Sequence, residues 1–224
     1  MISKTIVITG GSSGVGLCIL KKFLQENWHV YVISRTKPKL ADKTNKSFEF
    51  IRCDIRDFNQ VTDAFKQIKH IDVLVNNASI FKSKSFMKME TSEINEILDT
   101  NLKGTIFCTK QAIKKIKKGR IINISSVSGL HGIENQTIYS ASKHGVNGFS
   151  NSLSKEYLNK NIKVTTICPG GIDTPLWNSS NPYNGDTKRL IKPEEIADLV
   201  CFISKSKDHI VFKNITLFPE NEWH

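Results

Sequence analysis

Tyr139 and Lys143 stand four residues apart in a stretch with helical patterning. On a helix, residues at this spacing lie on one face, one turn apart. A free phenol has a pKa of about 10, which is too high for efficient proton transfer near neutral pH. An ammonium one turn away stabilises the phenolate and lowers that pKa. The pair therefore predicts proton exchange with a carbonyl or an alcohol, although a Tyr-x3-Lys spacing by itself is usually structural.

Two other polar residues strengthen this interpretation. Ser126 ends an apolar run thirteen residues before Tyr139, and its hydroxyl would be free to bind a carbonyl oxygen. Asn101 lies within a helical pattern, where its amide could bind water or disturb the hydrogen bonds of the helix. With Lys143, these side chains indicate a site that binds a carbonyl and moves a proton.

A glycine-rich turn near the start predicts a phosphate site. The β-branched run Thr5–Thr9 leads into it, and a helical pattern follows. Glycines allow a tight turn and let a pyrophosphate approach the backbone, while the start of the helix supplies free N–H groups. The spacing is Gly-x3-Gly-x-Gly rather than G-x-G-x-x-G, and a purely structural turn is the alternative. Candidate cofactor-binding residues here are Gly10, Ser12, Ser13, Gly14, Val15 and Gly16.

The end of the second apolar run, at Ser34, Arg35 and Thr36, bears on the choice of cofactor. Sites for NAD place an acid here, and that acid would repel a 2′-phosphate. An arginine pairs with such a phosphate through charge-assisted hydrogen bonds. We therefore expect NADP(H) to be preferred over NAD(H). The alternative is that Arg35 is a surface residue and that Asp42 reaches back to the ribose.

Two later segments also follow apolar runs, at the edge where ligands gather in open α/β sheets. Asp54, next to Ile55, could accept a hydrogen bond from the adenine amino group, or it could cap the helix that follows. Asn77, Ala78 and Ser79 follow the fourth run. All five residues are candidate cofactor contacts.

Continuous apolar or β-branched runs recur along the chain. They are Thr5–Thr9, His29–Ser34, Phe48–Cys53, Ile71–Val75, Arg120–Ser125, Lys163–Cys168 and Asn214–Phe218. Such runs are typical of parallel strands buried on both faces. The helical patterns between them are Val15–Asn27, Asp57–Lys69, Ser92–Lys118, Ile138–Lys160 and Pro193–Ser204. The alternation predicts an α/β doubly wound sheet of about seven mostly parallel strands, with helices on both faces, in a single domain over residues 1–224.

Composition excludes several classes of protein. The 224 residues are 39% hydrophobic and 24% charged, as in a soluble globular protein. No apolar run approaches the ~18 residues of a membrane span, and the start does not resemble a signal peptide. Five scattered cysteines without a CxxC motif suggest neither a disulfide framework nor a metal site. We therefore expect a reducing, cytoplasmic location.

The net charge of +11 raises the ideas of a nucleic-acid surface and of an anionic ligand. A solvated, lysine-rich surface is the simpler explanation, because no aromatic residues interleave with the basic run at residues 110–118. We expect no nucleic-acid and no membrane partner. Attraction of an acidic carrier protein or a phosphorylated substrate is a hypothesis that rests on the charge alone.

Taken together, these segments resemble the short-chain dehydrogenase/reductase family, whose fold is of the Rossmann type. The similarity runs from Thr9 to about Thr174, with the motifs in the family's order. They are TGGSSGVG (9–16), NNAS (76–79), NLKG (101–104), INISS (122–126), YSASK (139–143) and PGGIDT (169–174).

The resemblance implies a role for each matched residue. Tyr139 would be the general acid in reduction and the base in oxidation. Lys143 would lower the pKa of the phenol and bind the nicotinamide ribose. Ser126 would polarise the substrate carbonyl, and Asn101 would anchor a water that relays protons to Lys143. The turn that would lie against the nicotinamide and the pyrophosphate contains Pro169, Gly170, Ile172 and Thr174.

The chain also departs from the family. Ser79 stands where glycine is usual, which is a small change. The chain is shorter than most members after Thr174, and its C-terminal end differs from the family's usual subunit contact. The pattern Ile138–Lys160, which often forms a dimer face, is intact, so we expect a homo-oligomer, either a dimer or a tetramer.

Substrate identity should reside in the loops 79–90, 127–136 and 176–192. Apolar side chains in these loops could line a pocket or could equally be local core. These candidates are Ile80, Phe81, Leu130, His131, Leu176, Trp177 and Tyr183.

The sequence as a whole predicts an NADP(H)-dependent oxidoreductase. It would interconvert a carbonyl and an alcohol by hydride transfer on a small-molecule substrate, either a ketone, an aldehyde or an oxoacyl group, the last possibly carrier-bound. One alternative is a dinucleotide-binding regulator that does no chemistry. A nucleic-acid binder is the other, and only the net charge motivates it.

Overall fold

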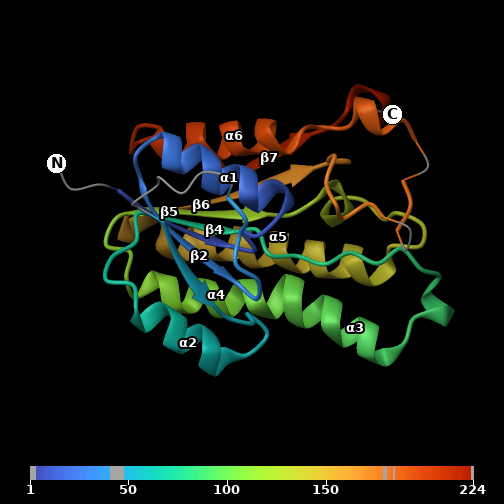
Figure 1. Ribbon diagram of the computed structural model, residues 1–224, viewed down its shortest axis with the longest axis horizontal. Helices are drawn as coiled ribbons and strands as arrows, with labels where there is room; N and C mark the ends of the chain where they lie inside the picture. Colours follow the sequence, from blue (N-terminus) through green and yellow to red (C-terminus); the bar gives the residue numbers. More distant parts are fainter. Residues whose placement is uncertain (1–3, 41–47, 179–180, 184, 223–224) are drawn as a thin grey trace.

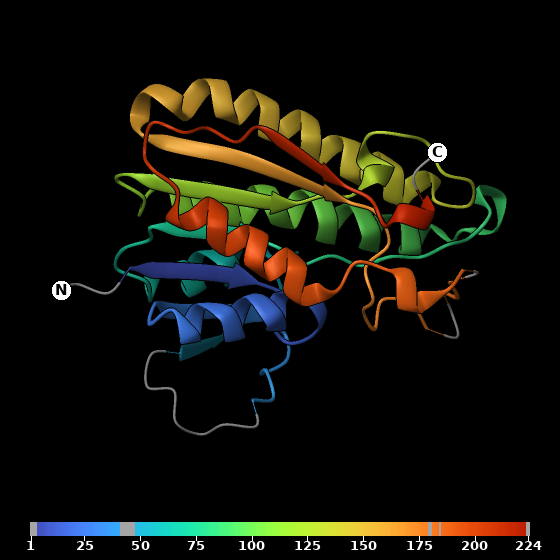
Figure 2. The ribbon, with the colours of Figure 1, turned by 90° about the horizontal axis from the view of Figure 1, so that it is seen from above.

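The computed structural model describes residues 4–40, 48–178, 181–183 and 185–222. Seven strands form one sheet in the order β3-β2-β1-β4-β5-β6-β7, and every neighbouring pair is parallel (Figure 1 and Figure 2). The strands are β1 (Thr5–Thr9), β2 (His29–Ser34), β3 (Phe48–Arg52), β4 (Val73–Asn76), β5 (Gly119–Ile124), β6 (Ile162–Pro169) and β7 (Asn214–Leu217). The predicted doubly wound sheet is confirmed.

Helices cover both faces of the sheet, which explains why the central strands carry continuous apolar runs. Along β1, Ile6 and Ile8 pack into the core under α1 and α6, whereas Val7 between them packs under the helices of the opposite face. At the two edges, β3 and β7 are only partly covered. The helices are α1 (Gly14–Gln25), α2 (Phe58–Lys66), α3 (Thr91–Leu98), α4 (Thr105–Ile113), α5 (Thr137–Tyr157) and α6 (Pro193–Lys205).

The pattern Ser92–Lys118, predicted as one helical stretch, is interrupted in the structure. A π-helical segment, Asp99–Gly104, separates α3 from α4. The side chain of Asn101 within it bonds to the backbone of Ile80 at both its oxygen and its nitrogen. Single π turns of this kind often mark functional sites. The expectation that this amide could disturb the helix therefore agrees with the observed geometry.

Two other features concern membrane spans and cysteines. None of the helices in the described ranges is long and apolar enough to cross a membrane. The five cysteines are free thiols, and all but Cys18 are buried.

A buried arginine fixes the far end of α6 to the sheet. Arg120 on β5 is only 4% exposed. Its guanidinium donates to the carbonyl oxygens of Ser206 and Lys207, each at 3.0 Å, and of Ile210 at 3.2 Å. These carbonyls belong to the segment that follows α6, which ends at Lys205. The side chain therefore ties this segment to β5.

Arg120→Met should lower the free energy of unfolding by about 3 kcal/mol, because the three hydrogen bonds of the charged, buried guanidinium are lost. Urea unfolding followed by circular dichroism measures the change. Lys118→Ala is the matched control, because Lys118 directly precedes β5. It forms an exposed ion pair with Asp208, which contributes less than about 1 kcal/mol. Equal losses in the two variants would contradict this role for Arg120.

Candidate active site

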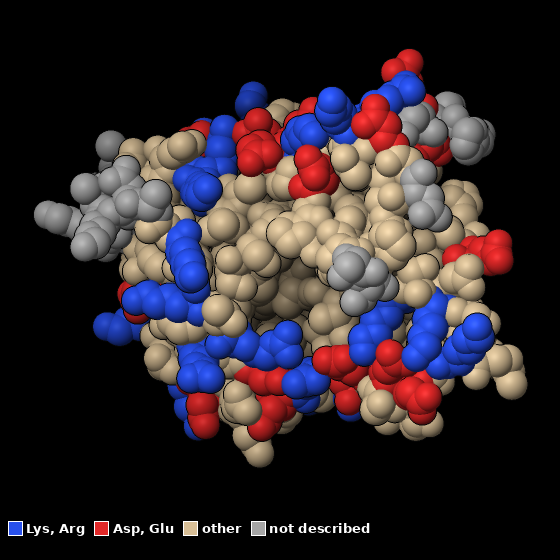
Figure 3. Space-filling view, turned by 45° about the vertical axis from the view of Figure 1, so that its right-hand side comes forward, with Lys and Arg blue, Asp and Glu red and all other residues tan. Residues whose placement is uncertain are grey.

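A cleft of about 1370 Å³ opens at the carboxyl ends of the parallel strands. Figure 3 shows this hollow, with Lys and Arg side chains along part of its rim and acidic side chains among them. Parallel topology brings the ends of all the strands to one edge, and ligands bind where the strand order reverses. Here that reversal lies at β1, between β2 and β4.

Most residues that the sequence predicted for the site line this cleft. They are Gly10, Ser12, Ser13, Gly14, Val15, Ser34, Arg35, Thr36, Asp54, Ile55, Asn77, Ala78, Ser79, Ser126, Tyr139, Lys143, Pro169, Gly170, Ile172 and Thr174. Gly16 and Asn101 are not part of its surface. Of the apolar candidates, Leu130 lies outside the lining, while the other six belong to it.

The glycine-rich turn requires residues without side chains. Gly10 has a φ of 69°, and a Cβ there would lie 2.7 Å from the Cα of Ala78. A Cβ on Gly16 would collide with the carbonyl oxygen of Gly10 and would lie 2.5 Å from the amide nitrogen of Asn77. The turn therefore packs directly against the segment after β4, and α1 begins immediately beyond it at Gly14.

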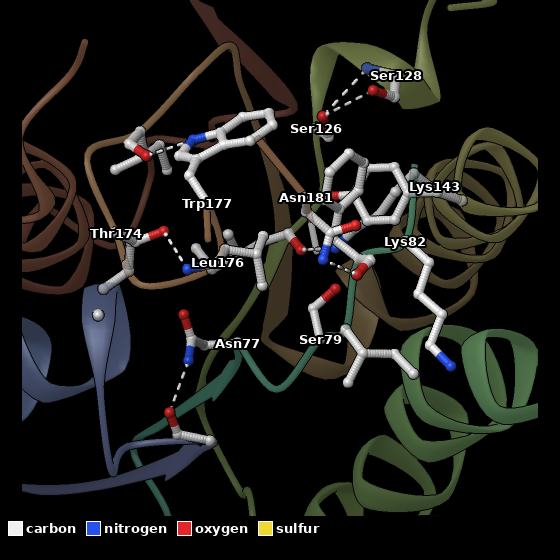
Figure 4. Close-up of a pocket in the computed structure, with 18 of the residues that line it drawn as sticks. Asn77, Ser79, Lys82, Ser126, Ser128, Lys143, Thr174, Leu176, Trp177 and Asn181 are labelled. Carbon is white, nitrogen blue, oxygen red and sulfur yellow. Dashed lines mark hydrogen bonds between the residues drawn. The ribbon is translucent and has the colours of Figure 1, made fainter. Parts of the chain in front are cut away.

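Polar side chains lock the ends of β1 and β4 together. Thr9 Oγ1 accepts hydrogen bonds from the backbone nitrogens of Asn77 and Ala78, both at 3.1 Å. In return, Asn77 Nδ2 donates to the carbonyl oxygens of Thr9 at 3.1 Å and Gly10 at 3.0 Å. One of these two bonds is drawn in Figure 4. The side chain of Asn77 therefore holds the shape of the glycine turn.

The end of β2 presents a free cation to the cleft. Ser34 Oγ donates to the carbonyl oxygen of Thr36 at 2.7 Å, which closes a tight turn around Arg35. Arg35 is exposed, lines the cleft and has no ion pair among the described residues. Asp42, the alternative ribose partner, lies outside the described residues.

Asp54 does not cap the helix that follows it. Asp57 caps α2, because its Oδ1 accepts from the backbone nitrogens of Asn59 at 2.8 Å and Gln60 at 3.2 Å. Asp54 instead accepts from the guanidinium of Arg56 at 2.6 to 3.0 Å, and this contact lowers the pKa of the Asp54 carboxyl. The carboxylate of Asp54 therefore lies at the cleft as a charged group.

Tyr139, Lys143 and Ser126 meet at the inner end of the cleft. Lys143 lies one turn after Tyr139 on α5, and its Nζ is 5.5 Å from the centre of the Tyr139 ring. That nitrogen donates to the carbonyl oxygen of Ile124, at the end of β5, at 3.0 Å. Ser126 follows the same strand, and its hydroxyl interacts with the phenol of Tyr139.

The pKa values differ from the expectation for this pair. Burial raises the pKa of Tyr139 to about 12, although the hydroxyls of Ser126 and Ser79 lower it in part. Burial also lowers the pKa of Lys143 to about 8. Charged forms are costly in a low-dielectric interior, so both groups shift toward neutrality. Because the ammonium is directed to Ile124, it does not offset this effect at the phenol.

The side chain of Asn101 is bound to two other segments of the chain. Its amide nitrogen donates to the carbonyl oxygen of Ile80 at 2.9 Å and to Ser142 Oγ at 3.1 Å, and its oxygen accepts from the nitrogen of Ile80. Ser142 lies on α5 between Tyr139 and Lys143. Asn101 is therefore buried behind these two side chains and ties α5 to the segment after β4.

A chain of side-chain hydrogen bonds supports Ser126, and the sequence did not indicate it. Ser126 Oγ accepts from the backbone nitrogen of Ser128 at 3.1 Å and lies 3.3 Å from Ser128 Oγ. Ser128 Oγ donates to Gln136 Oε1 at 2.8 Å. Gln136 stands three residues before Tyr139, a spacing that could have drawn attention to it.

The turn after β6 is held by a residue near the end of the chain. Glu222 Oε2 accepts from the backbone nitrogen of Gly171 at 2.7 Å, and its Oε1 accepts from the hydroxyl of Tyr183 at 2.8 Å. Across the cleft, a Cβ on Gly14 would lie 3.4 Å from Thr174 Cγ2. The glycine turn and the turn after β6 therefore face each other. No motif in the sequence pointed to Glu222.

Comparison with known proteins places this geometry in a family. The profile of the short chain dehydrogenase family matches residues 4–185. The chain is 36% identical to 3-oxoacyl-(acyl-carrier-protein) reductase FabG from Chlamydia muridarum, over 94% of each chain. It is 34% identical to carbonyl reductase family member 4 from Xenopus laevis, over 92% of each. Among solved structures, ElxO with NADP bound has a TM-score of 0.88 at 29% identity, covering 97% of this chain and 98% of that one.

The chain therefore belongs to the short-chain dehydrogenase/reductase family. It is an NAD(P)-dependent oxidoreductase, as members of this family are.

Gly16→Ala should weaken NADPH binding by about tenfold or more and lower the free energy of unfolding by about 1–3 kcal/mol, because the new methyl group forces Gly10 and Asn77 apart. Titration of cofactor fluorescence measures the binding. Gly148→Ala on α5 is the control, since nothing lies within 4 Å of its Cβ position. There, a stability gain of about 0.5–1 kcal/mol and an unchanged dissociation constant are expected. Unchanged NADPH affinity in folded Gly16→Ala would refute the role of this contact.

Proposed function

We propose that this protein is an NADP(H)-dependent oxidoreductase that interconverts a carbonyl and an alcohol on a ketone, an aldehyde or an oxoacyl group. The observation that carries the proposal is that Tyr139, with the hydroxyl of Ser126 beside it, lines the same cleft as the glycine turn. The bacterial and vertebrate relatives are both named for the reduction of carbonyl compounds, which supports this reaction class.

The residues present fit a dinucleotide. The backbone of Gly10 and Gly14 lies open to the cleft, and both residues have positive φ. Ser13, at the start of α1, makes no side-chain capping bond within the described part of the chain, so the first N–H groups of the helix are available to phosphate oxygens. Ser12 and Thr174 would complete the pyrophosphate site. A nicotinamide cofactor bound here supplies or accepts the hydride.

Tyr139 is the proposed proton donor in reduction, and its deprotonated form is the proposed acceptor in oxidation. A pKa of about 12 keeps the phenol protonated near neutrality, ready to donate as the substrate oxygen gains charge. Ser126 donates to the same oxygen and so polarises the carbonyl. Lys143 would bind the ribose hydroxyls of the cofactor. Asn101 would act through Ser142 and Ile80, by positioning α5.

The preference for NADP(H) is proposed from Arg35. Its guanidinium stands at the cleft without an ion pair in the described chain, whereas the nearby carboxylate of Asp54 is neutralised by Arg56. The end of β2 therefore offers a net positive site for a 2′-phosphate. The structural relative ElxO binds NADP, which supports the same choice.

The partner is proposed to be a small molecule. A second proposed substrate is an oxoacyl group on a carrier, which the name of the chlamydial relative supports. A cytoplasmic homo-oligomer is proposed on the sequence argument alone. A dinucleotide-binding regulator without catalysis is the alternative function, and it would bind NADPH without turning over any carbonyl.

Tyr139→Phe should lower kcat for carbonyl reduction by about 10²–10⁴, because the proton donor is lost. NADPH oxidation at 340 nm with ketones, quinones and oxoacyl thioesters measures turnover, and cofactor fluorescence shows that binding is kept. Tyr157→Phe, at the end of the same helix, is the control and should retain wild-type activity. Full activity in Tyr139→Phe would refute the mechanism, and tight binding without turnover in the wild type would support the regulator.

Arg35→Ala should weaken NADPH binding about 10-fold to 100-fold, which corresponds to the loss of a charge-assisted hydrogen bond. NADH binding should change less than about twofold, since NADH lacks the 2′-phosphate. Dissociation constants for both cofactors, measured at one fixed ionic strength, test this. Lys37→Ala removes a neighbouring exposed charge that does not line the cleft, and it should affect neither cofactor. Equal weakening of both cofactors would exclude Arg35 as the phosphate partner.

A further inference from the structure

Four aromatic rings form a continuous line from the phenol of Tyr139 into the loop after β6. Phe81 meets Tyr139 edge to face, with 4.9 Å between ring centres and an angle of 81° between the planes. Trp177 meets Phe81 at 5.2 Å and 70°, and Tyr183 meets Trp177 at 5.1 Å and 55°. These separations are typical of favourable aromatic pairs. All four residues line the cleft.

The polar atoms of Trp177 and Tyr183 are hydrogen-bonded to groups outside this line of rings. Trp177 Nε1 donates to the carbonyl oxygen of Ile172 at 2.9 Å, and the hydroxyl of Tyr183 donates to Glu222 at 2.8 Å. Figure 4 shows the indole nitrogen directed to its backbone acceptor, while the six-membered ring extends in the opposite direction. Beyond Tyr139 itself, the line therefore presents ring carbon rather than hydrogen-bonding groups.

Hydrogen bonds hold the described residues of the loop that carries Trp177 and Tyr183. Asn181 is 9% exposed; its Oδ1 accepts from the backbone nitrogen of Ser83 at 2.9 Å, and its Nδ2 donates to the carbonyl oxygen of Phe81 at 3.2 Å. Glu222 joins the same loop to the turn at Gly171. A surface ordered in advance loses little conformational freedom when a ligand binds to it.

Lys82 and Glu222, the charged groups beside this wall of aromatic rings, also have partners. Lys82 pairs with Glu96 at 3.1 Å and Glu93 at 3.5 Å, and Figure 4 shows its ammonium directed away from the rings. Both oxygens of Glu222 accept hydrogen bonds. A charged or polyhydroxylated substituent placed against the wall would lose its hydration without gaining partners.

We propose that Phe81, Trp177 and Tyr183 form a subsite for an apolar, planar substituent of the carbonyl substrate. Aryl ketones, and apolar carbonyl compounds in general, are the substrate class that this subsite favours over polyhydroxylated ones. The inference rests on the proposed function, because it takes Tyr139 as the group beside which the carbonyl lies. Glu222 and Asn181 are positioning residues for the wall.

The test compares kcat/KM, with saturating NADPH, for acetophenone and for dihydroxyacetone. The expected values are higher for acetophenone in the wild type. Trp177→Ala should lower the acetophenone value by roughly tenfold, because a large aromatic contact is lost, and should change the dihydroxyacetone value less than about twofold. Trp177→Phe should restore acetophenone reduction to within about threefold of wild type. Phe202→Ala, on α6 and 62% exposed, is the aromatic control and should change neither value.

A parallel loss for both substrates in Trp177→Ala would show that the residue only stabilises the loop and would overturn the proposal, as would no change for either. Binding of 1-phenylethanol, measured by calorimetry with NADPH present, supplies a readout that needs no turnover. Ten-times weaker binding in Trp177→Ala than in the wild type would support the subsite even if Tyr139 were not the acid. Equal binding would refute the subsite while leaving the proposed reaction standing.

Discussion

The site depends on the reciprocal hydrogen bonds between the end of β1 and the end of β4. Thr9 accepts from two backbone nitrogens after β4, and Asn77 donates to two carbonyls of the glycine turn. These bonds hold a turn that must pass within contact distance of Ala78. Since β1 lies where the strand order reverses, they also fix one wall of the crevice that the reversal creates. A dinucleotide could approach the backbone only if that wall stays in place.

Burial sets the pKa values of the two side chains on α5. Tyr139 and Lys143 lie one turn apart in a low-dielectric interior, which raises the pKa of the phenol to about 12 and lowers that of the amine to about 8. The hydroxyls of Ser126 and Ser79 act in the opposite direction on the phenol, and Ser126 is itself supported by Ser128 and Gln136. The phenol is therefore positioned by neutral hydroxyl groups, while Lys143 donates to the carbonyl oxygen of Ile124.

Much of this arrangement could be predicted from the sequence. Continuous apolar runs place β2, β4 and β5, and residues just after such runs must meet at one sheet edge, which locates Arg35, Asn77 and Ser126. Contacts between distant segments could not be predicted: Asn181 with Ser83 and Glu222 with Gly171 follow no periodicity. Nor could the partner of Asn101, which is the backbone of Ile80, or the direction of the pKa shift at Tyr139, which depends on burial in three dimensions.

The carboxylate of Glu222 joins the segment after β7, the tail of the described chain, to the loop above the cleft. Loop and tail therefore behave as one module for protein engineering. A chimera that exchanged only residues 171–191 with a relative would remove Tyr183 and leave the Glu222 carboxylate without that donor. A chimera that is to keep the shape of the cleft must therefore exchange Glu222 together with the loop.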